Sequence, residues 1–381
     1  MVESLYVHIP FCRKICPYCA FASVRDKYLD HDRYVSAVCS EIISSSHLNS
    51  SAPLKSIFFG GGTPTQLEPL LLGRILSTVD DVCGIADESE ITVEANPGSI
   101  DKEKIVGLLE VGFNRLSIGV QSFDSKTLTK LGRVHTVEEA IETFLNARQC
   151  GFENINIDLM FSIPEIPDKS WQYSVHKGIE LEPEHISTYG LIFEENTPFA
   201  ALRDLGRMVE IEDDLDAFQY EWIRRELIEA GYMHYEVSNY SKPGYSCKHN
   251  LVYWTDKSYI GVGLSSHSYN YPKRWWNTCD LNLYLDRLED ESNVVEGEEV
   301  LSKETALRDR FWLGLRTNKG VKLTVEEELR LSENLRFKDI EYSGRWVIEN
   351  GFLMILPDSF VLADSLAIEA TEILEYDLLS N

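Results

Sequence analysis

The sequence lacks any apolar run approaching the roughly 20 residues that a membrane span requires. Its beginning, MVESLYVHIP, also lacks the charged, apolar and small-residue regions of a secretory signal. We therefore expect a protein of the cytoplasm without a membrane span. Because thiols stay reduced in that compartment, the eight cysteines do not indicate a disulfide framework.

Basic residues are scarce. Lys and Arg number 36 against 62 Asp and Glu, a formal net charge of -26. Such a chain repels phosphate backbones and anionic lipid headgroups, so we expect no nucleic acid among its partners. With 44% hydrophobic and 26% charged residues, the composition is that of a globular protein. Its 381 residues indicate one large domain with an appendage.

Short runs rich in β-branched and aromatic residues recur through the first half of the chain and predict strands. They are six in number: 5–11, 56–63, 91–97, 115–123, 154–161 and 185–193. Apolar residues recur at helical spacing between them, over 66–79, 101–113 and 136–152. Such alternation indicates an α/β fold with a parallel sheet, either an open doubly wound sheet or a barrel. Unusual residues gather at the carboxyl ends of the strands, which favours a partial TIM-like (β/α)6 barrel.

Three regions are expected along the chain. Residues 1–235 form the partial barrel, 236–292 extend it, and 293–381 form a small, mainly helical C-terminal domain. Further elements are a long helix over 213–232, an acidic linker over 293–304 and a strand pair within 346–363.

Three cysteines, Cys12, Cys16 and Cys19, lie close together in a C-x3-C-x2-C pattern. This spacing lets one loop hold three corners of a cubane iron-sulfur cluster and leaves the fourth iron for a ligand that is not protein. Two alternatives are a zinc site completed by His8 and a group of buried thiols. The other cysteines are scattered and predicted to be small buried hydrophobes: Cys39, Cys83, Cys150, Cys247 and Cys279.

Glycine and polar residues follow the later strands. The glycines of GGGTP allow close approach of the backbone to a ligand, although a tight turn explains them equally well. Polar side chains at successive strand ends together indicate a binding site. They are Thr63, Glu94, Gln121, Arg133 and Asp158.

The cysteine motif, with the aromatic Tyr18 before its last cysteine, resembles that of the radical S-adenosylmethionine superfamily. This resemblance implies a 4Fe-4S cluster on Cys12, Cys16 and Cys19, with S-adenosylmethionine chelating the open iron. The stretches YVHIPFC, FFGGGTPT, EANP, RLSIGVQSFD, LGRVH and DLMFSIP are similar to the oxygen-independent coproporphyrinogen III oxidase group. By that resemblance S-adenosylmethionine contacts Tyr6, Tyr18, Gly61, Gly62, Thr63, Glu94, Gln121, Arg133 and Asp158.

Two branches of this group differ near the cysteines. Oxidases carry a further cysteine two residues after the third and a longer N-terminal extension, whereas this chain has Phe21 there and five residues before Tyr6. The short N-terminus and the aromatic residue resemble the HemW-type heme chaperones. The chain departs from the group at Phe161 and Ser162, where relatives have a small or polar residue and a glycine.

The heme chaperone branch also carries H-N-x-x-Y-W, which is present here as His249, Asn250, Tyr253 and Trp254. This match implies that His249 binds heme, because imidazole is an axial iron ligand and aromatic rings pack on a macrocycle. A core histidine bonded to the backbone is the alternative. Competing iron ligands are His267, Cys247 and Tyr253, and candidate cations for the heme propionates are Lys248 and Arg274.

The resemblance predicts a heme chaperone that binds a 4Fe-4S cluster, S-adenosylmethionine and heme and delivers heme to acceptor hemoproteins. The first alternative is a coproporphyrinogen III oxidase, which decarboxylates two propionates to vinyl groups. The second is a vestigial scaffold whose cluster is only structural. An electron donor is a further expected partner, and the oligomeric states considered include a dimer.

Overall fold

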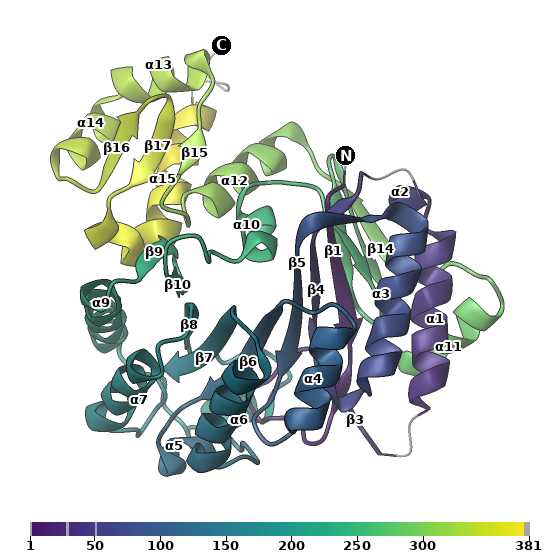
Figure 1. Cartoon of the computed structure of the whole chain (residues 1–381). Coiled ribbons are helices and arrows are strands. Elements are labelled where there is room, and N and C mark those ends of the chain that lie inside the picture. Colours follow the sequence, from purple (N-terminus) through teal and green to yellow (C-terminus); the bar gives the residue numbers. More distant parts are fainter. Residues whose placement is uncertain (1, 28–29, 50–51, 377–381) are drawn as a thin grey trace.

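The computed structural model describes residues 2–27, 30–49 and 52–376. A nine-stranded sheet forms its centre, in the order β11-β1-β4-β5-β6-β7-β8-β10-β9 (Figure 1). Its parallel core consists of β1 (Ser4–Ile9), β4 (Leu54–Gly61), β5 (Ile85–Ala95), β6 (Arg115–Gln121), β7 (Ile155–Phe161) and β8 (His185–Gly190). These are the six predicted strands. The α/β fold with a partial barrel is therefore confirmed.

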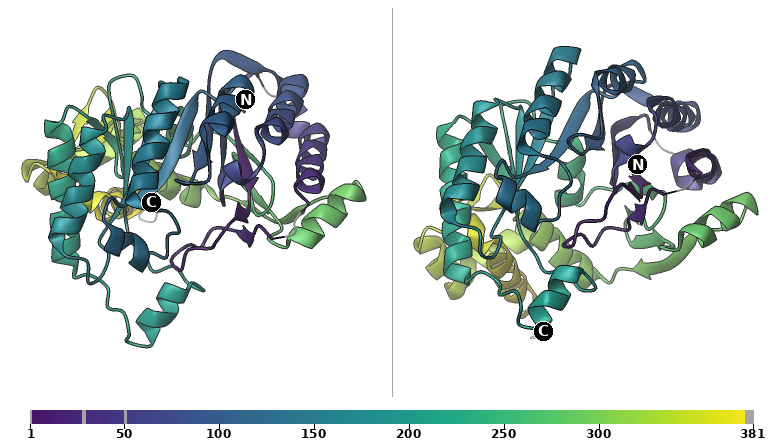
Figure 2. Two further views of the ribbon diagram at one scale, coloured as in Figure 1. Left: turned by 60° about the horizontal axis from the view of Figure 1, so that its bottom comes forward. Right: turned by 90° about the horizontal axis from the view of Figure 1, so that it is seen from below.

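Helices lie along the outer face of the curved sheet (Figures 1 and 2). The longer ones are α1 (His31–Ser44), α3 (Pro69–Cys83), α4 (Lys102–Glu110), α6 (Val137–Cys150), α7 (Asp168–Glu180) and α9 (Asp213–Glu229). Shorter elements between strands are α2 (Ser46–Asn49), α5 (Ser125–Lys130), α8 (Pro198–Asp204) and the 3-10 turn Pro64–Gln66. The helices predicted over 66–79, 101–113, 136–152 and 213–232 correspond to α3, α4, α6 and α9.

The alternation of side chains along β6 separates the core from the interior of the barrel. Leu116 and Ile118 are fully buried in the main hydrophobic cluster, whereas Arg115 and Ser117 line an internal cavity. Successive side chains of a strand point to opposite faces, so apolar residues pack under the helices while polar ones face inward. The interior therefore collects the polar residues of the parallel strands.

The chain after β8 adds strands to both edges of the sheet. Strands β9 (Met233–Glu236) and β10 (Asn239–Ser241) add antiparallel strands beside β8, and β11 (Ile260–Val262) pairs parallel with β1. Helix α10 (Lys248–Trp254) lies near the beginning of β1, at the end of the sheet opposite β3 (Val24–Arg25) (Figure 1). The H-N-x-x-Y-W motif therefore lies at the amino ends of the parallel strands.

The prediction of a linker over 293–304 is wrong for the central part of this segment. Residues Val295–Val300 form β14, which pairs antiparallel with β13 (Lys273–Asn277), and β13 pairs with β12 (His267–Asn270). Four of its six residues are glutamate or glycine and most are exposed, as an edge strand permits, so the acidic composition concealed the strand. Helix α11 (Leu281–Glu289) lies between β13 and β14 in the sequence. The division of the chain into three regions stays a prediction.

The C-terminal part has its own hydrophobic cluster, around Phe311, Trp346 and Leu353. It comprises α12 (Lys303–Gly314), β15 (Val321–Lys322), α13 (Val325–Glu333), α14 (Leu335–Tyr342), β16 (Trp346–Glu349), β17 (Phe352–Ile355), the 3-10 turn Pro357–Leu362 and α15 (Ala363–Tyr376). The predicted strand pair is confirmed as β16 and β17, with β15 as a third strand. Within the described residues, no helix is long and apolar enough to cross a membrane.

Ser162, which stands where the resemblance predicts a glycine, has a left-handed backbone with φ of 55°. Glycine adopts this conformation without strain, whereas other residues need local support. Two residues of α9 supply it: the Ser162 amide donates to Gln219 Oε1 at 2.9 Å, and the Ser162 hydroxyl donates to Asp216. The serine thus keeps the turn that follows β7.

Candidate functional site

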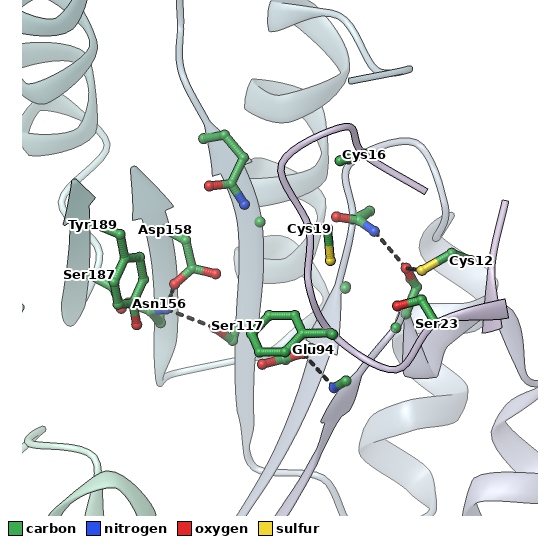
Figure 3. Close-up of a pocket in the computed structure, with 18 of the residues that line it drawn as sticks. Cys12, Cys16, Cys19, Ser23, Glu94, Ser117, Asn156, Asp158, Ser187 and Tyr189 are labelled. Atoms are coloured by element: carbon green, nitrogen blue, oxygen red, sulfur yellow. Dashed lines mark hydrogen bonds between the residues drawn. The ribbon is translucent and has the colours of Figure 1, made fainter. Parts of the chain in front are cut away.

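A cavity of about 560 Å3 lies inside the partial barrel. The cysteine loop forms one side of it, and Asp158 and Tyr189 lie on the opposite side, with Glu94 and Ser117 between them (Figure 3). All thirteen residues predicted from the cysteine motif, the strand ends and His249 line this single space: Tyr6, Cys12, Cys16, Tyr18, Cys19, Gly61, Gly62, Thr63, Glu94, Gln121, Arg133, Asp158 and His249. Residues far apart in the sequence therefore form one site.

Two contacts and an internal turn fix the cysteine loop over the carboxyl ends of the strands. The short strand β2 (Phe11–Cys12) pairs parallel with β3, and His8 Nε2 donates a 2.8 Å hydrogen bond to the Ala22 carbonyl. A turn then brings the Cys19 amide to 3.1 Å from the Cys16 carbonyl. All three thiols are free and partly exposed. Burial raises the pKa of both the Cys12 and the Cys19 thiol, so metal binding has to displace their protons.

These thiols suit a cluster better than a single zinc ion. His8, the proposed fourth zinc ligand, uses both ring nitrogens, since the Tyr6 hydroxyl donates to Nδ1 at 3.1 Å while Nε2 bonds Ala22. Among the described residues, no three Cys, His, Asp or Glu side chains converge on one metal position. A cubane cluster has no such requirement, because each cysteine binds a separate iron. The donor set therefore fits a 4Fe-4S cluster.

A hydrogen-bond network joins two of the thiols. The Cys12 thiol lies 3.7 Å from Thr63 Oγ1, which accepts a bond of 2.6 Å from Asn96 Nδ2. Arg133 continues this network, because it donates to Asn96, to the Gly119 carbonyl at 2.7 Å and to Cys16 Sγ at 3.6 Å. The guanidinium thus places a positive charge beside a thiol that would be ionised in a cluster.

The glycine triplet also allows close packing within the protein, while the predicted approach of its backbone to a ligand stays a prediction. Gly61 has φ of 107°, and a Cβ at this position would lie 2.4 Å from the His8 ring. A Cβ on Gly62 would lie 2.6 Å from the Pro10 carbonyl. The Gly62 amide meanwhile donates to the Ile9 carbonyl at 2.8 Å. Both glycines therefore let β4 approach the segment that leads into the cysteine loop.

Two buried carboxyl groups face the same cavity. Burial, followed by the nearby charge of Asp158, raises the pKa of Glu94 to about 8. Burial also raises the pKa of Asp158, against the lowering effect of hydrogen bonds from Asn156 and Ser187. Asn156 Nδ2 donates to Asp158 Oδ1 at 2.7 Å, and the Gly61 amide donates to Glu94 at 3.2 Å. Near neutral pH, Glu94 can therefore donate as well as accept a hydrogen bond.

The remaining predicted cofactor residues are two tyrosines and a glutamine that line the cavity. The Tyr6 ring stacks at 6.3 Å on Phe58, and Tyr18 packs at 6.2 Å against Phe199. Burial raises the pKa of both tyrosines, so their hydroxyls stay protonated. Gln121 ends β6 with a left-handed φ of 66°, a conformation that is uncommon for residues other than glycine.

His249 forms part of the amino end of the cavity, away from the cysteines. Its Nδ1 donates to Ser56 Oγ at 3.1 Å, because the Ser56 hydroxyl itself donates to Ser4 Oγ. The Tyr253 hydroxyl then donates to Nε2 at 2.8 Å. The imidazole is only 1% exposed, and burial, followed by the charge of Arg115, lowers its pKa to about 3. His249 is therefore neutral, and its Nε2 lone pair accepts a hydrogen bond from the Tyr253 hydroxyl.

The helix that carries His249 is held by a buried carboxylate. Glu90 accepts hydrogen bonds from the amides of Lys248 and His249, at 3.0 and 3.1 Å, and from the Cys247 thiol at 3.3 Å. A carboxylate at a helix N-terminus satisfies amides that have no partner within the helix. The Cys247 thiol keeps its proton, since burial raises its pKa to about 12. The resting state of Cys247 is therefore unsuited to binding iron.

The other candidates from the sequence lie outside the cavity. His267 is exposed and stacks at 5.8 Å on Trp276. Lys248 Nζ donates to the Glu88 carbonyl at 2.8 Å, and Arg274 forms an ion pair with Asp309. None of these three lines the space that holds the cysteines and His249.

Some residues of the cavity were missed by sequence reasoning, namely Asn96, Arg115, Asn156, Ser187 and Tyr189. The alternation of side chains along a strand could have predicted most of them, because residues two positions apart point to the same face. Asn96 therefore points inward like Glu94, and Asn156 points inward like Asp158. Asn156 is central to a buried chain: its Oδ1 accepts from His185 Nδ1 at 2.6 Å and from the Ser187 hydroxyl at 3.1 Å. This chain fixes the amide that orients Asp158.

Comparisons with known proteins agree with this geometry. The family model described as the Radical SAM superfamily matches residues 6–177. Heme chaperone HemW of Bacillus subtilis is 36% identical over 321 residues, which is 84% of this chain and 85% of that protein. Heme chaperone HemW of Mycobacterium tuberculosis is 31% identical over 364 residues, 94% of this chain and 93% of that one.

Among solved structures, the coproporphyrinogen III oxidase HemN of Escherichia coli, a radical SAM enzyme, superposes with a TM-score of 0.81. The superposition covers 97% of this chain and 89% of HemN at 23% identity, which establishes a shared fold. Radical SAM membership implies a 4Fe-4S cluster and S-adenosylmethionine as cofactors. Identity of 31 to 36% over most of both chains shows that this protein belongs to the HemW family of the radical SAM superfamily.

Proposed function

We propose that this protein is a heme chaperone that binds a 4Fe-4S cluster, S-adenosylmethionine and heme, and delivers heme to acceptor hemoproteins. The observation that supports it most is 36% identity, over 84% of the chain, to a protein named heme chaperone. Phe21 adds to this, because it stands where oxidases of the group have a further cysteine, and it is 71% exposed at the rim of the cavity.

The carboxyl end of the cavity is the proposed site of the cluster and S-adenosylmethionine. Cys12, Cys16 and Cys19 would bind three irons, with the Arg133 guanidinium beside Cys16. Glu94 and Asp158 offer two buried carboxyl groups to the ribose and ammonium of the cofactor. The reduced cluster, when bound, supplies the electron that cleaves the sulfonium bond of S-adenosylmethionine. An electron donor is therefore a required partner.

The amino end of the cavity is the proposed site of heme, with His249 as the iron ligand. The Nε2 lone pair has the chemistry that iron requires, since it carries no proton at neutral pH. Ligation needs the Tyr253 hydroxyl to leave Nε2, at the cost of one hydrogen bond. Such a bond contributes roughly 1 kcal/mol in proteins, far less than a metal-ligand bond. Phe58, stacked 5.2 Å from the imidazole, adds apolar surface for the macrocycle.

The test is an anaerobic titration of the reconstituted protein with heme, followed by absorbance, together with a coproporphyrinogen III assay of the same preparation. We expect one heme bound per chain and no protoporphyrinogen in the presence of S-adenosylmethionine and reductant. Turnover without heme binding would overturn the proposal in favour of the oxidase. Transfer of the bound heme to an apo-hemoprotein, measured by the acceptor's absorbance, then tests delivery.

A further inference from the structure

One cationic side chain in the cavity, that of Arg115, has a nitrogen atom without a hydrogen-bond partner among the described residues. Among the described residues, the cations that line the cavity are Lys14, Arg115 and Arg133. Lys14 Nζ donates to the Gly132 carbonyl at 2.9 Å, and Arg133 is bound to Asn96, Gly119 and Cys16. Arg115 is only 2% exposed, and its Nε has no hydrogen-bond partner within the described part of the chain. A buried, unpartnered guanidinium nitrogen is costly unless a ligand satisfies it.

Arg115 lies at the amino end of the cavity, close to His249. It is the first residue of β6, and its side chain shares the inward parity of Ser117. Its charge is near enough to lower the pKa of both His249 and His185, in each case after the effect of burial. The cation and the predicted iron ligand therefore face the same part of the interior.

The carboxyl groups whose charges act on Arg115, those of Glu90 and Asp158, are hydrogen-bonded to other residues. Glu90 already accepts from the Cys247 thiol and from the amides of Lys248 and His249. Asp158, at the carboxyl end, accepts a hydrogen bond from Asn156 Nδ2 at 2.7 Å. A guanidinium is a planar fork that matches a carboxylate with two parallel hydrogen bonds. The group that best satisfies Arg115 is therefore a carboxylate carried by a ligand.

We propose that Arg115 binds a carboxylate of the ligand inside the barrel, and that this carboxylate is a propionate of the heme. The assignment rests on the proposed function and extends it to one residue of the chain. It replaces the candidates from the sequence, because Lys248 is held by the Glu88 carbonyl and Arg274 by Asp309, both outside the cavity. An arginine beside the iron ligand would orient the macrocycle as well as hold it.

The test compares hemin with hemin dimethyl ester, in which both propionates are blocked, by absorbance titration of the full-length protein. We expect the wild-type protein to prefer hemin by about tenfold, as for a hydrogen bond to a charged group. Arg115→Gln should abolish the preference, and Arg115→Met, similar in length and without charge, should do the same. The control is Arg274→Gln, which removes a cation outside the cavity and should keep the wild-type preference.

Each contrary outcome has one meaning. A wild-type protein that binds the ester as tightly as hemin overturns the inference without any variant, as does a folded Arg115→Gln protein that keeps the preference. A variant that keeps the preference but binds S-adenosylmethionine about tenfold more weakly assigns Arg115 to the carboxylate of that cofactor and also overturns it. A wild-type protein that binds neither porphyrin refutes the proposed function itself.

Discussion

The two ends of the cavity differ in how ready they are for a ligand. At the carboxyl end, three partly exposed thiols and two buried carboxyls face the open space. At the amino end, His249 is 1% exposed and both of its ring nitrogens are hydrogen-bonded within the protein. The first end is therefore open to a cofactor, whereas the proposed heme site at the second end can bind iron only after an internal hydrogen bond opens. A chaperone that must also release its heme would benefit from such competition.

Removal of one thiol should have the largest effect, and only at the carboxyl end. Cys12→Ala should abolish the absorbance of the reconstituted cluster, because two cysteines do not hold a cubane. Cys279→Ala is the control, since this exposed thiol lies outside the cavity and should leave the absorbance intact. Heme binding by the Cys12 variant then measures how independent the two ends are. Full cluster absorbance in that variant would refute the assignment of the thiols.

Close packing beneath the cysteine loop can be tested with a matched pair of glycines. Gly61 and Gly112 have nearly equal φ, 107° and 108°, but an added Cβ meets the His8 ring only at Gly61. Gly112→Ala should cost about 1 kcal/mol of unfolding free energy for its backbone alone. Gly61→Ala adds a steric clash and should cost about 3 kcal/mol or more. Chemical denaturation of both variants measures the difference, and equal costs would contradict the packing described for His8.

The raised pKa of Glu94, at the carboxyl end of the cavity, predicts that the stability of the protein depends on pH. Its pKa is about 8 in the folded protein, against 4.5 as the ordinary value, with burial as the main cause and Asp158 next. The folded carboxyl keeps its proton while the unfolded one ionises, so stability falls as pH rises from about 4.5 to 8. Glu94→Gln does not titrate, and its stability relative to wild type should rise over this range, by at most about 1.4 kcal/mol per pH unit. Denaturation curves at several pH values check this, and a constant difference would refute it.

The smallest expected effect concerns the hydrogen bond between Tyr253 and His249 at the amino end of the cavity. Tyr253→Phe removes the hydroxyl that donates to His249 Nε2 and so removes the competitor of iron. Since one such bond contributes roughly 1 kcal/mol, heme affinity should rise about fivefold. Tyr259→Phe is a control, because this neighbouring ring packs 4.6 Å from Tyr253 without bonding the imidazole. A weaker affinity in the Tyr253 variant would make that hydroxyl, rather than the imidazole, the group that heme needs.

The sequence was a good guide to the carboxyl end because its residues lie in short motifs directly after strands. Parallel strands bring their carboxyl ends together, so Cys12, Glu94 and Asp158 could be placed in one site from strand order alone. The amino end is built differently. His249 reaches the cavity from a helix that crosses the opposite end of the sheet, a placement that depends on the path of the chain after β8.

The contacts of individual side chains could not be predicted from the sequence, because they join residues that lie far apart in the chain. The glycines of GGGTP suggested contact with a ligand, but the atoms nearest to Gly61 belong to His8, more than fifty residues earlier in the chain. Arg115 looked like an ordinary strand residue, and only its burial without a partner for Nε led to its proposed role in binding. The strand β14 was hidden by its acidic composition, since an edge strand needs few apolar residues.

The most direct test of the account is heme titration of His249→Ala beside His267→Ala. His267 was a competing ligand, and its exposed side chain lies on strand β12, outside the cavity. The account predicts that His249→Ala loses the absorbance of histidine-ligated heme while His267→Ala keeps it. Because the pKa of His249 is about 3, the wild-type spectrum should also stay constant across the pH range in which an ordinary histidine titrates. Retention of the ligated spectrum in His249→Ala, with its loss in His267→Ala, would contradict the assignment of heme to the amino end.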